Sequence, residues 1–219
     1  NEWWAVTVSN RRHSRCKRDA LPTELTALCV FLYVILNKIT TKNFIIFKRI
    51  KYDYINKKDN ILKSLHKDTK PSDWIMKQIK KIRINKESIK VLDFASGNGR
   101  HSIPLANEKK IITAIDKDQD KLDFYKDHKN IRAICFDLET NEKWPLIQNE
   151  YDIVLVTNYL YRPRIKDLTY LVNENGYLLY ETFSEGNEKF GKPSNTNYLL
   201  KENELIYTFK NDFNLIEYF

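Results

Sequence analysis

Glycine, proline and cysteine are all scarce in this sequence. The 219 residues include only 5 glycines and 6 prolines, which excludes a collagen-like, loop-rich or low-complexity chain. The 3 cysteines have no metal-ligand spacing, so no metal site is expected. Cys135 lies inside an apolar stretch and is interpreted as a buried, inert thiol in a reducing cytoplasm. The composition therefore predicts a packed cytoplasmic protein without a metal.

Hydrophobic runs of membrane-spanning length are also lacking. The apolar run Leu28–Leu36 is far shorter than the roughly 20 residues that cross a bilayer. Basic residues precede it, as in a signal peptide, but no small-residue cleavage site follows. Neither a membrane partner nor secretion is expected.

Charge is unevenly distributed along the chain. The formal net charge is +8, and residues 1–58 alone hold 12 Lys/Arg against 4 Asp/Glu. The remaining 161 residues are therefore neutral overall. Because the excess positive charge lies in this first segment, the high pI does not predict a nucleic-acid partner for the rest of the chain.

The first 60 residues do not have the pattern of a folded domain. Residues 1–28 lack helical or strand periodicity and are either a disordered basic arm or a translated antisense strand of a transfer-RNA gene. We favour the second hypothesis, because Thr7–Arg12 and Leu21–Ala27 can be back-translated into the reverse complements of a TΨC arm and a D arm. Residues 29 to about 60 would then be AT-rich intergenic sequence. The sequence predicts an irregular or weakly helical extension over 1–60 and one folded domain over 61–219.

From Pro71 onward, short apolar strands alternate with helical stretches. This pattern is typical of an α/β fold with a doubly wound, mostly parallel sheet, in which helices cover both faces. Ser72 or Asp73 is expected to cap the first helix. The predicted strands are Ile89–Phe94, Ile111–Ile115, Ile131–Cys135, Tyr151–Thr157, Tyr177–Thr182 and Leu215–Phe219. The predicted helices are Trp74–Ile82, His101–Asn107, Gln119–Lys126, Ile165–Leu171 and Lys201–Phe209.

Polar and glycine residues follow the first predicted strands, where a parallel sheet gathers its loops at one edge. In the turn after the first strand, Gly97 and Gly99 allow positive φ and a close approach of backbone to a ligand. The third glycine of a dinucleotide-binding fingerprint is replaced by Ser102. Asp93 precedes the turn and would repel a pyrophosphate but accept from an ammonium group. The turn therefore counts against NAD, whose pyrophosphate Asp93 would repel.

Two further acids end the next two strands. Asp116 can accept hydrogen bonds from both ribose hydroxyls of a nucleoside, and the alternative is a surface acid in a polar turn. Asp137 can pair with an adenine amino group while Leu138 covers the ring, and the alternative is an ordinary turn residue. Position at the strand ends favours the ligand-binding interpretation in both cases.

Together these features resemble the class I S-adenosylmethionine-dependent methyltransferases over residues 71–219. The strings Val91–Glu108, Val156–Pro163 and Tyr180–Asn195 resemble, more narrowly, a bacterial subgroup of tellurite-resistance-type methyltransferases. The resemblance implies a Rossmann-like fold and S-adenosylmethionine as cofactor; the substrate and the oligomeric state stay open. It implies the cofactor residues Asp93, Ala95, Gly97, Gly99, Asp116, Asp137, Leu138 and Asn158.

Methyl transfer from a sulfonium requires alignment and removal of water more than acid–base groups. Candidates for handling the acceptor are Asn158, Tyr161, Arg162 and Glu181, together with Asn187. Arg162 would suit an anion, and Glu181 could act as a base with a raised pKa. The alternative for each is a structural hydrogen bond. We expect the acceptor to be a small molecule.

The end of the chain departs from the family pattern. Class I domains insert a seventh, antiparallel strand between the fifth and sixth, but this chain stops within the apparent sixth strand. The C-terminal strand is therefore expected to be missing, with an unpaired hydrophobic edge on Tyr177–Thr182. The alternatives to a small-molecule enzyme are a nucleic-acid or protein methyltransferase, and an inactive truncated or mis-called gene product. A nucleic-acid enzyme is disfavoured, because Thr157–Pro163 lacks the Asn/Asp-Pro-Pro-Tyr/Phe motif of amino-directed enzymes.

Overall fold

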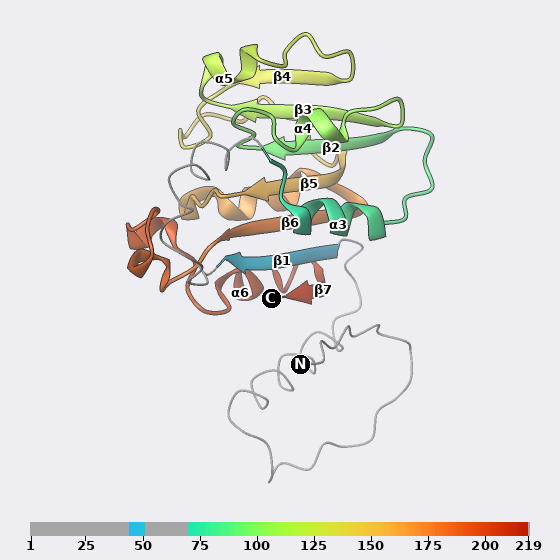
Figure 1. Cartoon of the computed structure of the whole chain (residues 1–219). Coiled ribbons are helices and arrows are strands. Elements are labelled where there is room, and N and C mark those ends of the chain that lie inside the picture. Colours follow the sequence, from blue (N-terminus) through green and yellow to red (C-terminus); the bar gives the residue numbers. More distant parts are fainter. Residues whose placement is uncertain (1–43, 51–69, 219) are drawn as a thin grey trace, which may run out of the picture.

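The computed structural model describes residues 44–50 and 70–218. Within these ranges, seven strands form one sheet in the order β4-β3-β2-β5-β6-β1-β7, and every neighbouring pair is parallel (Figure 1). The doubly wound, mostly parallel fold that the sequence predicts is therefore confirmed. The strands are β1 (Phe44–Ile50), β2 (Ile89–Phe94), β3 (Lys110–Asp116), β4 (Ile131–Cys135), β5 (Tyr151–Thr157), β6 (Val172–Phe183) and β7 (Asn214–Tyr218).

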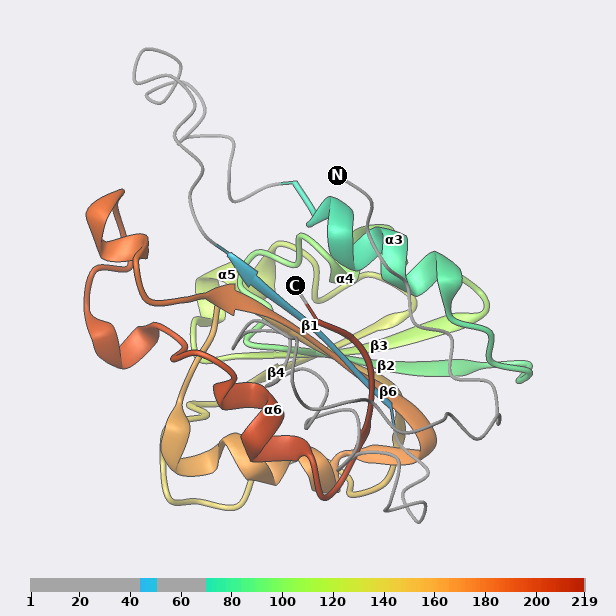
Figure 2. The same ribbon diagram turned by 90° about the horizontal axis from the view of Figure 1, so that it is seen from below.

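Helices cover both faces of this sheet. In Figure 2, α3 and α4 lie on one face, and η1 and α6 lie on the other. The central strand β5 is buried along its whole length, and it is therefore apolar in an almost continuous run. The helices are α3 (Asp73–Lys81), α4 (Ser102–Leu105), α5 (Gln119–Asp123), η1 (Arg162–Tyr170), η2 (Asn187–Lys189), η3 (Thr196–Tyr198) and α6 (Glu204–Phe209), where η denotes a 3₁₀ helix.

Each face of the sheet has its own hydrophobic core. On the α3 side, Ile75 and Ile79 pack over Val91 and Leu155. On the other side, Leu168 and Phe209 belong to the core that contains Val154. The central strands β2, β3, β5 and β6 thus contribute side chains to the cores on both faces of the sheet.

The sequence located the strands more closely than the helices. The strands differ from their predicted bounds by one residue or less, except β6, which begins five residues earlier at Val172. The predicted helix over His101–Asn107 is reduced to the four residues Ser102–Leu105, because the backbone turns to an extended conformation at the C-cap residue Ala106. The predicted helix over Ile165–Leu171 is a 3₁₀ helix that begins at Arg162. Ser72 caps α3, and its Oγ accepts from the backbone N of Ile75 at 3.3 Å.

The position between β6 and β7 is occupied by β1. Its residues Phe44–Ile50 pair with Tyr177–Phe183 of β6, and Phe44–Phe47 pair with β7. The unpaired edge expected on Tyr177–Thr182 is therefore wrong. Residues 44–50 were expected to belong to an irregular or weakly helical extension. They form a strand instead, because β6 and β7 pair with their backbone on both sides and Ile45, Ile46 and Phe47 are buried. The antisense hypothesis for residues 1–28 lies outside the described residues.

Among the described residues, no helix combines the length and the apolar character that crossing a bilayer requires.

Candidate functional site

The turn between β2 and α4 has an unusual backbone conformation. Ala95, Gly97 and Gly99 have φ values of 57°, 53° and 71°, which lie in the left-handed region. A Cβ on Gly99 would lie 2.7 Å from the ring of Tyr125, so this position also requires glycine for space. The alternation of left-handed residues folds the chain back on itself at the carboxyl edge of the sheet.

Tyr125 packs against this turn and contacts it through its hydroxyl. Its hydroxyl donates to the backbone carbonyl of Gly97 at 3.0 Å and lies 2.9 Å from Ser96 Oγ. Burial raises the pKa of Tyr125 to about 12, so the hydroxyl keeps its proton and remains a donor. Tyr125 was not among the predicted site residues. Its spacing of three residues from the buried Leu122 was the available signal that it faces the sheet.

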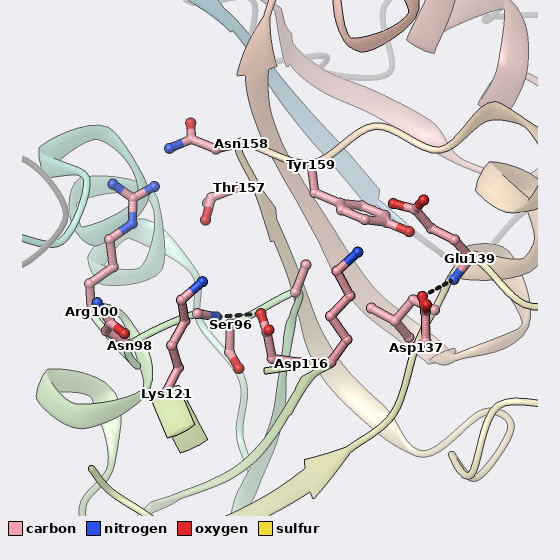
Figure 3. Close-up of a pocket in the computed structure, with 14 residues that line it drawn as sticks. Ser96, Asn98, Arg100, Asp116, Lys121, Asp137, Glu139, Thr157, Asn158 and Tyr159 are labelled. Carbon is pink, nitrogen blue, oxygen red and sulfur yellow. Dashed lines mark hydrogen bonds between the residues drawn. The ribbon is translucent and has the colours of Figure 1, made fainter. Parts of the chain in front are cut away.

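Asp116 ties the turn to the end of β3. Its Oδ2 accepts from the backbone N of Gly97 at 2.7 Å, and its Oδ1 accepts from the backbone N of Asp118 at 3.0 Å (Figure 3). A carboxylate oxygen can accept more than one hydrogen bond, so both oxygens retain capacity for a ligand. Asp116 therefore both shapes the turn and presents a carboxylate to the cavity beside it.

Asp137, Leu138 and Glu139 form the rim beyond β4. Asp137 is exposed, and its Oδ1 accepts from the backbone N of Glu139 at 3.0 Å. Leu138 is buried, and its carbonyl accepts from Trp144 Nε1 at 3.2 Å. This segment provides an acid at the surface and an apolar side chain beneath it.

Asp93 lies beneath the turn rather than in the cavity wall. Its Oδ2 accepts from Ser102 Oγ at 2.7 Å, and its Oδ1 has no partner among the described residues. Burial raises the pKa of Asp93 to about 7. This carboxyl is therefore a titrating group near neutral pH, directly below the site.

His101 connects the site to α3. Its Nε2 accepts from the backbone N of Ser72 at 2.9 Å, so the imidazole is neutral. Burial, together with the charge of Arg100, lowers the pKa of His101 to about 3. His101 is therefore a packing residue that holds the backbone of the N-cap residue of α3.

A cavity of about 360 Å³ opens above the turn. Six of the eight predicted cofactor residues line it: Ala95, Gly97, Asp116, Asp137, Leu138 and Asn158. Asp93 and Gly99 lie outside the lining. Eight lining residues were not predicted: Ser96, Asn98, Arg100, Lys117, Lys121, Glu139, Thr157 and Tyr159. Figure 3 shows the stretch from Asn98 to Arg100, the end of β3 and the residues after β5 surrounding one space.

The far wall of the cavity comes from the end of β5. Asn158 has a left-handed φ of 55°, and its backbone N donates to the carbonyl of Glu181 at 2.8 Å. Tyr159 packs its ring against Phe94 with centroids 5.6 Å apart, and its hydroxyl is buried without a hydrogen-bond partner in the described ranges. Burial raises the pKa of Tyr159. This unpartnered hydroxyl was missed because no sequence spacing distinguishes it from Tyr161.

The other predicted acceptor residues lie outside the cavity lining. Arg162 makes a two-pronged contact with Glu204, at 2.6 Å and 2.9 Å, and also donates to the carbonyls of Asn197 and Leu199. Its guanidinium therefore binds α6 and the preceding loop instead of facing an anionic substrate. Tyr161 is the N-cap residue of η1, directly before Arg162.

Glu181 and Asn187 are buried and engaged elsewhere. Glu181 forms a salt bridge with Lys48 of β1, whose Nζ lies 3.0 Å from Oε1. The side-chain amide of Asn187 donates to the carbonyl of Pro193 at 2.9 Å. Both contacts hold the carboxyl end of β6 and the loop that follows it. In the part of the chain that the structure describes, no cluster of His, Cys, Asp or Glu could hold a metal ion.

Residues 91–175 match a family described as "Methyltransferase domain". No curated protein matches. A putative methyltransferase from an antibiotic biosynthesis pathway of Anabaena variabilis is 14% identical, with a TM-score of 0.51 over 66% of this chain and 62% of its own. TehB from Haemophilus influenzae is 24% identical, with a TM-score of 0.51 over 64% of this chain and 50% of its own.

A methyltransferase from Aquifex aeolicus described as SAM-dependent is 19% identical, with a TM-score of 0.51 over 74% of this chain and 88% of its own. The chain thus spans less than two thirds of the first two proteins. At these identities the likenesses show the fold. Residues 91–175 of this chain thus match a methyltransferase domain, and its seven-stranded parallel sheet has the Rossmann-like fold of the class I methyltransferases.

Proposed function

We propose that the cavity binds S-adenosylmethionine and that the protein transfers its methyl group to a small-molecule acceptor. The observation that carries the proposal is the left-handed turn of Ala95, Gly97 and Gly99, which Asp116 holds at the carboxyl edge of the sheet. A parallel sheet binds ligands at this edge, where the strand order reverses. The strand order reverses between β2 and β5, directly beneath the turn.

The residues around the turn have the chemistry that the cofactor requires. Asp116 keeps acceptor capacity for the two ribose hydroxyls, while Asp137 accepts from the adenine amino group. Leu138 offers an apolar surface to the adenine ring. The sulfonium supplies an activated methyl group, so the residues of the chain bind, orient and exclude water rather than activate the donor.

Asp116→Asn tests the proposal. The variant loses a carboxylate that makes charge-assisted hydrogen bonds, so affinity for S-adenosylmethionine and S-adenosylhomocysteine should fall about tenfold to a hundredfold, as measured by calorimetry. Asp120→Asn is the matched control, because Asp120 is exposed on α5 and outside the cavity. Thermal melting without ligand shows whether each variant is folded.

A native chain that binds neither ligand would contradict the proposal and favour an inactive gene product. Equal affinities for native protein and the Asp116 variant would reject the role given to Asp116 while leaving the cavity as the site.

A further inference from the structure

Lys48 of β1 carries an amine that the structure holds at the carboxyl edge of the sheet. Its Nζ lies 3.0 Å from Oε1 of Glu181, and the side chains of the two residues are 36% and 4% exposed. The same Nζ lies over the ring of Trp74, 6.0 Å from the ring centroid. A carboxylate and an aromatic face are groups that bind a protonated amine. The amine that occupies this arrangement belongs to the chain itself.

The pairing of three strands places this amine close to the cavity. Lys48 and Thr157 are both register partners of Glu181, one on each side, in the adjacent strands β1, β6 and β5 (Figure 1). The three side chains therefore form a row on one face of the sheet. Neighbouring strands lie about 4.8 Å apart, so the row spans roughly 10 Å. Because Thr157 lines the cavity, the ammonium of Lys48 lies within about two strand spacings of the cavity wall.

The cofactor of the proposed function brings its methyl group to the same wall. With the adenine ring on Leu138 and the ribose on Asp116, the sulfonium extends toward the wall that contains Thr157 (Figure 3). Lys48 is partly exposed, and a lysine side chain has a flexible four-carbon stem, so its amine can move from the carboxylate toward this wall. A nucleophile of the chain itself is thus within reach of the activated methyl group.

We infer that Lys48 is a methyl acceptor, so that the protein methylates its own β1. The inference rests on the proposed function, which supplies the cofactor. In this step a proton of the Lys48 ammonium passes to the carboxylate of Glu181, and the freed lone pair on Nζ attacks the methyl carbon. The methyl–sulfur bond breaks, and its electron pair stays on sulfur, which gives S-adenosylhomocysteine. The positive sulfonium nearby favours loss of the proton, because a like charge disfavours the charged form of the amine.

A second ion pair of the same kind provides the matched control. Lys86 forms a salt bridge with Asp152, and their side chains are 49% and 4% exposed, so pairing and burial resemble those of Lys48 and Glu181. Asp152 is the second residue of β5 and lies at the amino edge of the sheet, away from the cavity. Methylation that depends only on exposure or ion pairing would modify both lysines. Methylation that depends on the cavity would modify Lys48 alone.

The experiment uses the purified full chain and S-adenosylmethionine without any extract. Mass spectrometry of peptides should show methyl groups on Lys48 at about ten times the level on Lys86 or more. The rate per molecule should not change with protein concentration, because the transfer occurs within one molecule. Glu181→Gln removes the proton acceptor and should lower the rate at least about tenfold, in a variant whose folding is checked by thermal melting. Lys48→Arg should remove most of the label from the chain, and this variant then serves to measure transfer to other acceptors.

The outcomes separate this inference from the proposed function. If calorimetry shows that the native protein binds neither S-adenosylmethionine nor S-adenosylhomocysteine, the proposed function itself fails. If the native protein binds them and Lys48 gains no more methyl than Lys86, the inference is overturned and the cofactor site stands. A rate per molecule that rises with protein concentration also overturns it, since the methyl group would then pass between copies. An unchanged rate in a folded Glu181→Gln variant overturns the proton transfer to Glu181.

Discussion

Asp93 and His101 are buried close to each other in sequence and have pKa values displaced in opposite directions. The folded-state pKa of Asp93 is raised from 3.8 to about 7, so its contribution to stability is present below pH 3.8 and lost as the pH rises to 7. The folded-state pKa of His101 is lowered from 6.5 to about 3, so its contribution is present above pH 6.5 and lost as the pH falls to 3. Between about pH 4 and 6.5 the two effects oppose each other.

Removing either side chain should leave the pH dependence of the unfolding free energy that the other side chain causes. Relative to native protein, Asp93→Asn should gain unfolding free energy with rising pH, by about 1.4 kcal/mol per pH unit between about pH 4 and 6.5. His101→Gln should lose unfolding free energy with rising pH, relative to native protein, at a similar rate. Glutamine is chosen because its side-chain oxygen can still accept from Ser72. Urea denaturation at four or five pH values gives both slopes.

The native protein is the reference for both variants, because every other titrating group is shared. If the two variants follow the native pH dependence in parallel, the buried pair does not titrate as assigned.

Some residues of the cavity could be predicted from the sequence, because the topology of a parallel sheet alone determines their position at its edge. Asp116 and Asp137 follow parallel strands, and the strands of such a sheet end at one edge, so both reach the cavity rim. Arg100 and Tyr125 were not predictable, since their roles depend on how a short turn and a loop close over each other. The partners of Arg162 and Glu181 also could not be foreseen, because Glu204 and Lys48 lie far along the chain.

At the scale of elements, β1 is the strand of the described sheet that was not predicted from the sequence. Phe44–Ile50 is too short to show a periodicity, and it follows a segment whose composition does not indicate a folded domain. Its place depends on β6 and β7, more than a hundred residues away, so local sequence has no signal for it. Ile45 and Phe47 are buried on one face and Ile46 on the other.

Phe47→Ala tests whether β1 belongs to the folded sheet in solution. The side chain is 0% exposed, and its ring centroid lies 6.3 Å from that of Phe209 and 6.2 Å from that of Tyr218. Truncation should lower the unfolding free energy by about 3 to 5 kcal/mol, measured by chemical denaturation.

Phe124→Ala is the matched control, because Phe124 is 80% exposed, and it should change stability by less than about 0.5 kcal/mol. A Phe47 variant as stable as the Phe124 variant would show that β1 does not complete the sheet.

At the scale of the whole molecule, charge distinguishes the classes of acceptor. Residues 59–219 have no net charge, and the cavity lining balances Arg100, Lys117 and Lys121 against Asp116, Asp137 and Glu139. Nucleic-acid binding depends on neutralising many phosphates, which requires an excess of basic side chains on one surface. The balanced charge of the cavity lining supports the proposal of a small acceptor that enters the cavity.

Incubation with S-adenosylmethionine labelled in its methyl group and a cell extract checks this expectation. Label should appear in the small-molecule filtrate at several times the level obtained with Asp116→Asn. Label that stays with the nucleic acid or protein fraction would favour the alternative acceptors.

The pairing of β1 with β6 also has a consequence for the order of synthesis. β1 leaves the ribosome about 130 residues before Tyr177, its first partner on β6, which at about 5 to 20 residues per second amounts to roughly 7 to 26 seconds. During that interval the apolar stretch Phe44–Phe47 has no strand to pair with, and only Lys48 and Arg49 discourage its association with other nascent chains. The segment that completes the sheet is therefore also the one most in need of protection by a chaperone before the domain closes.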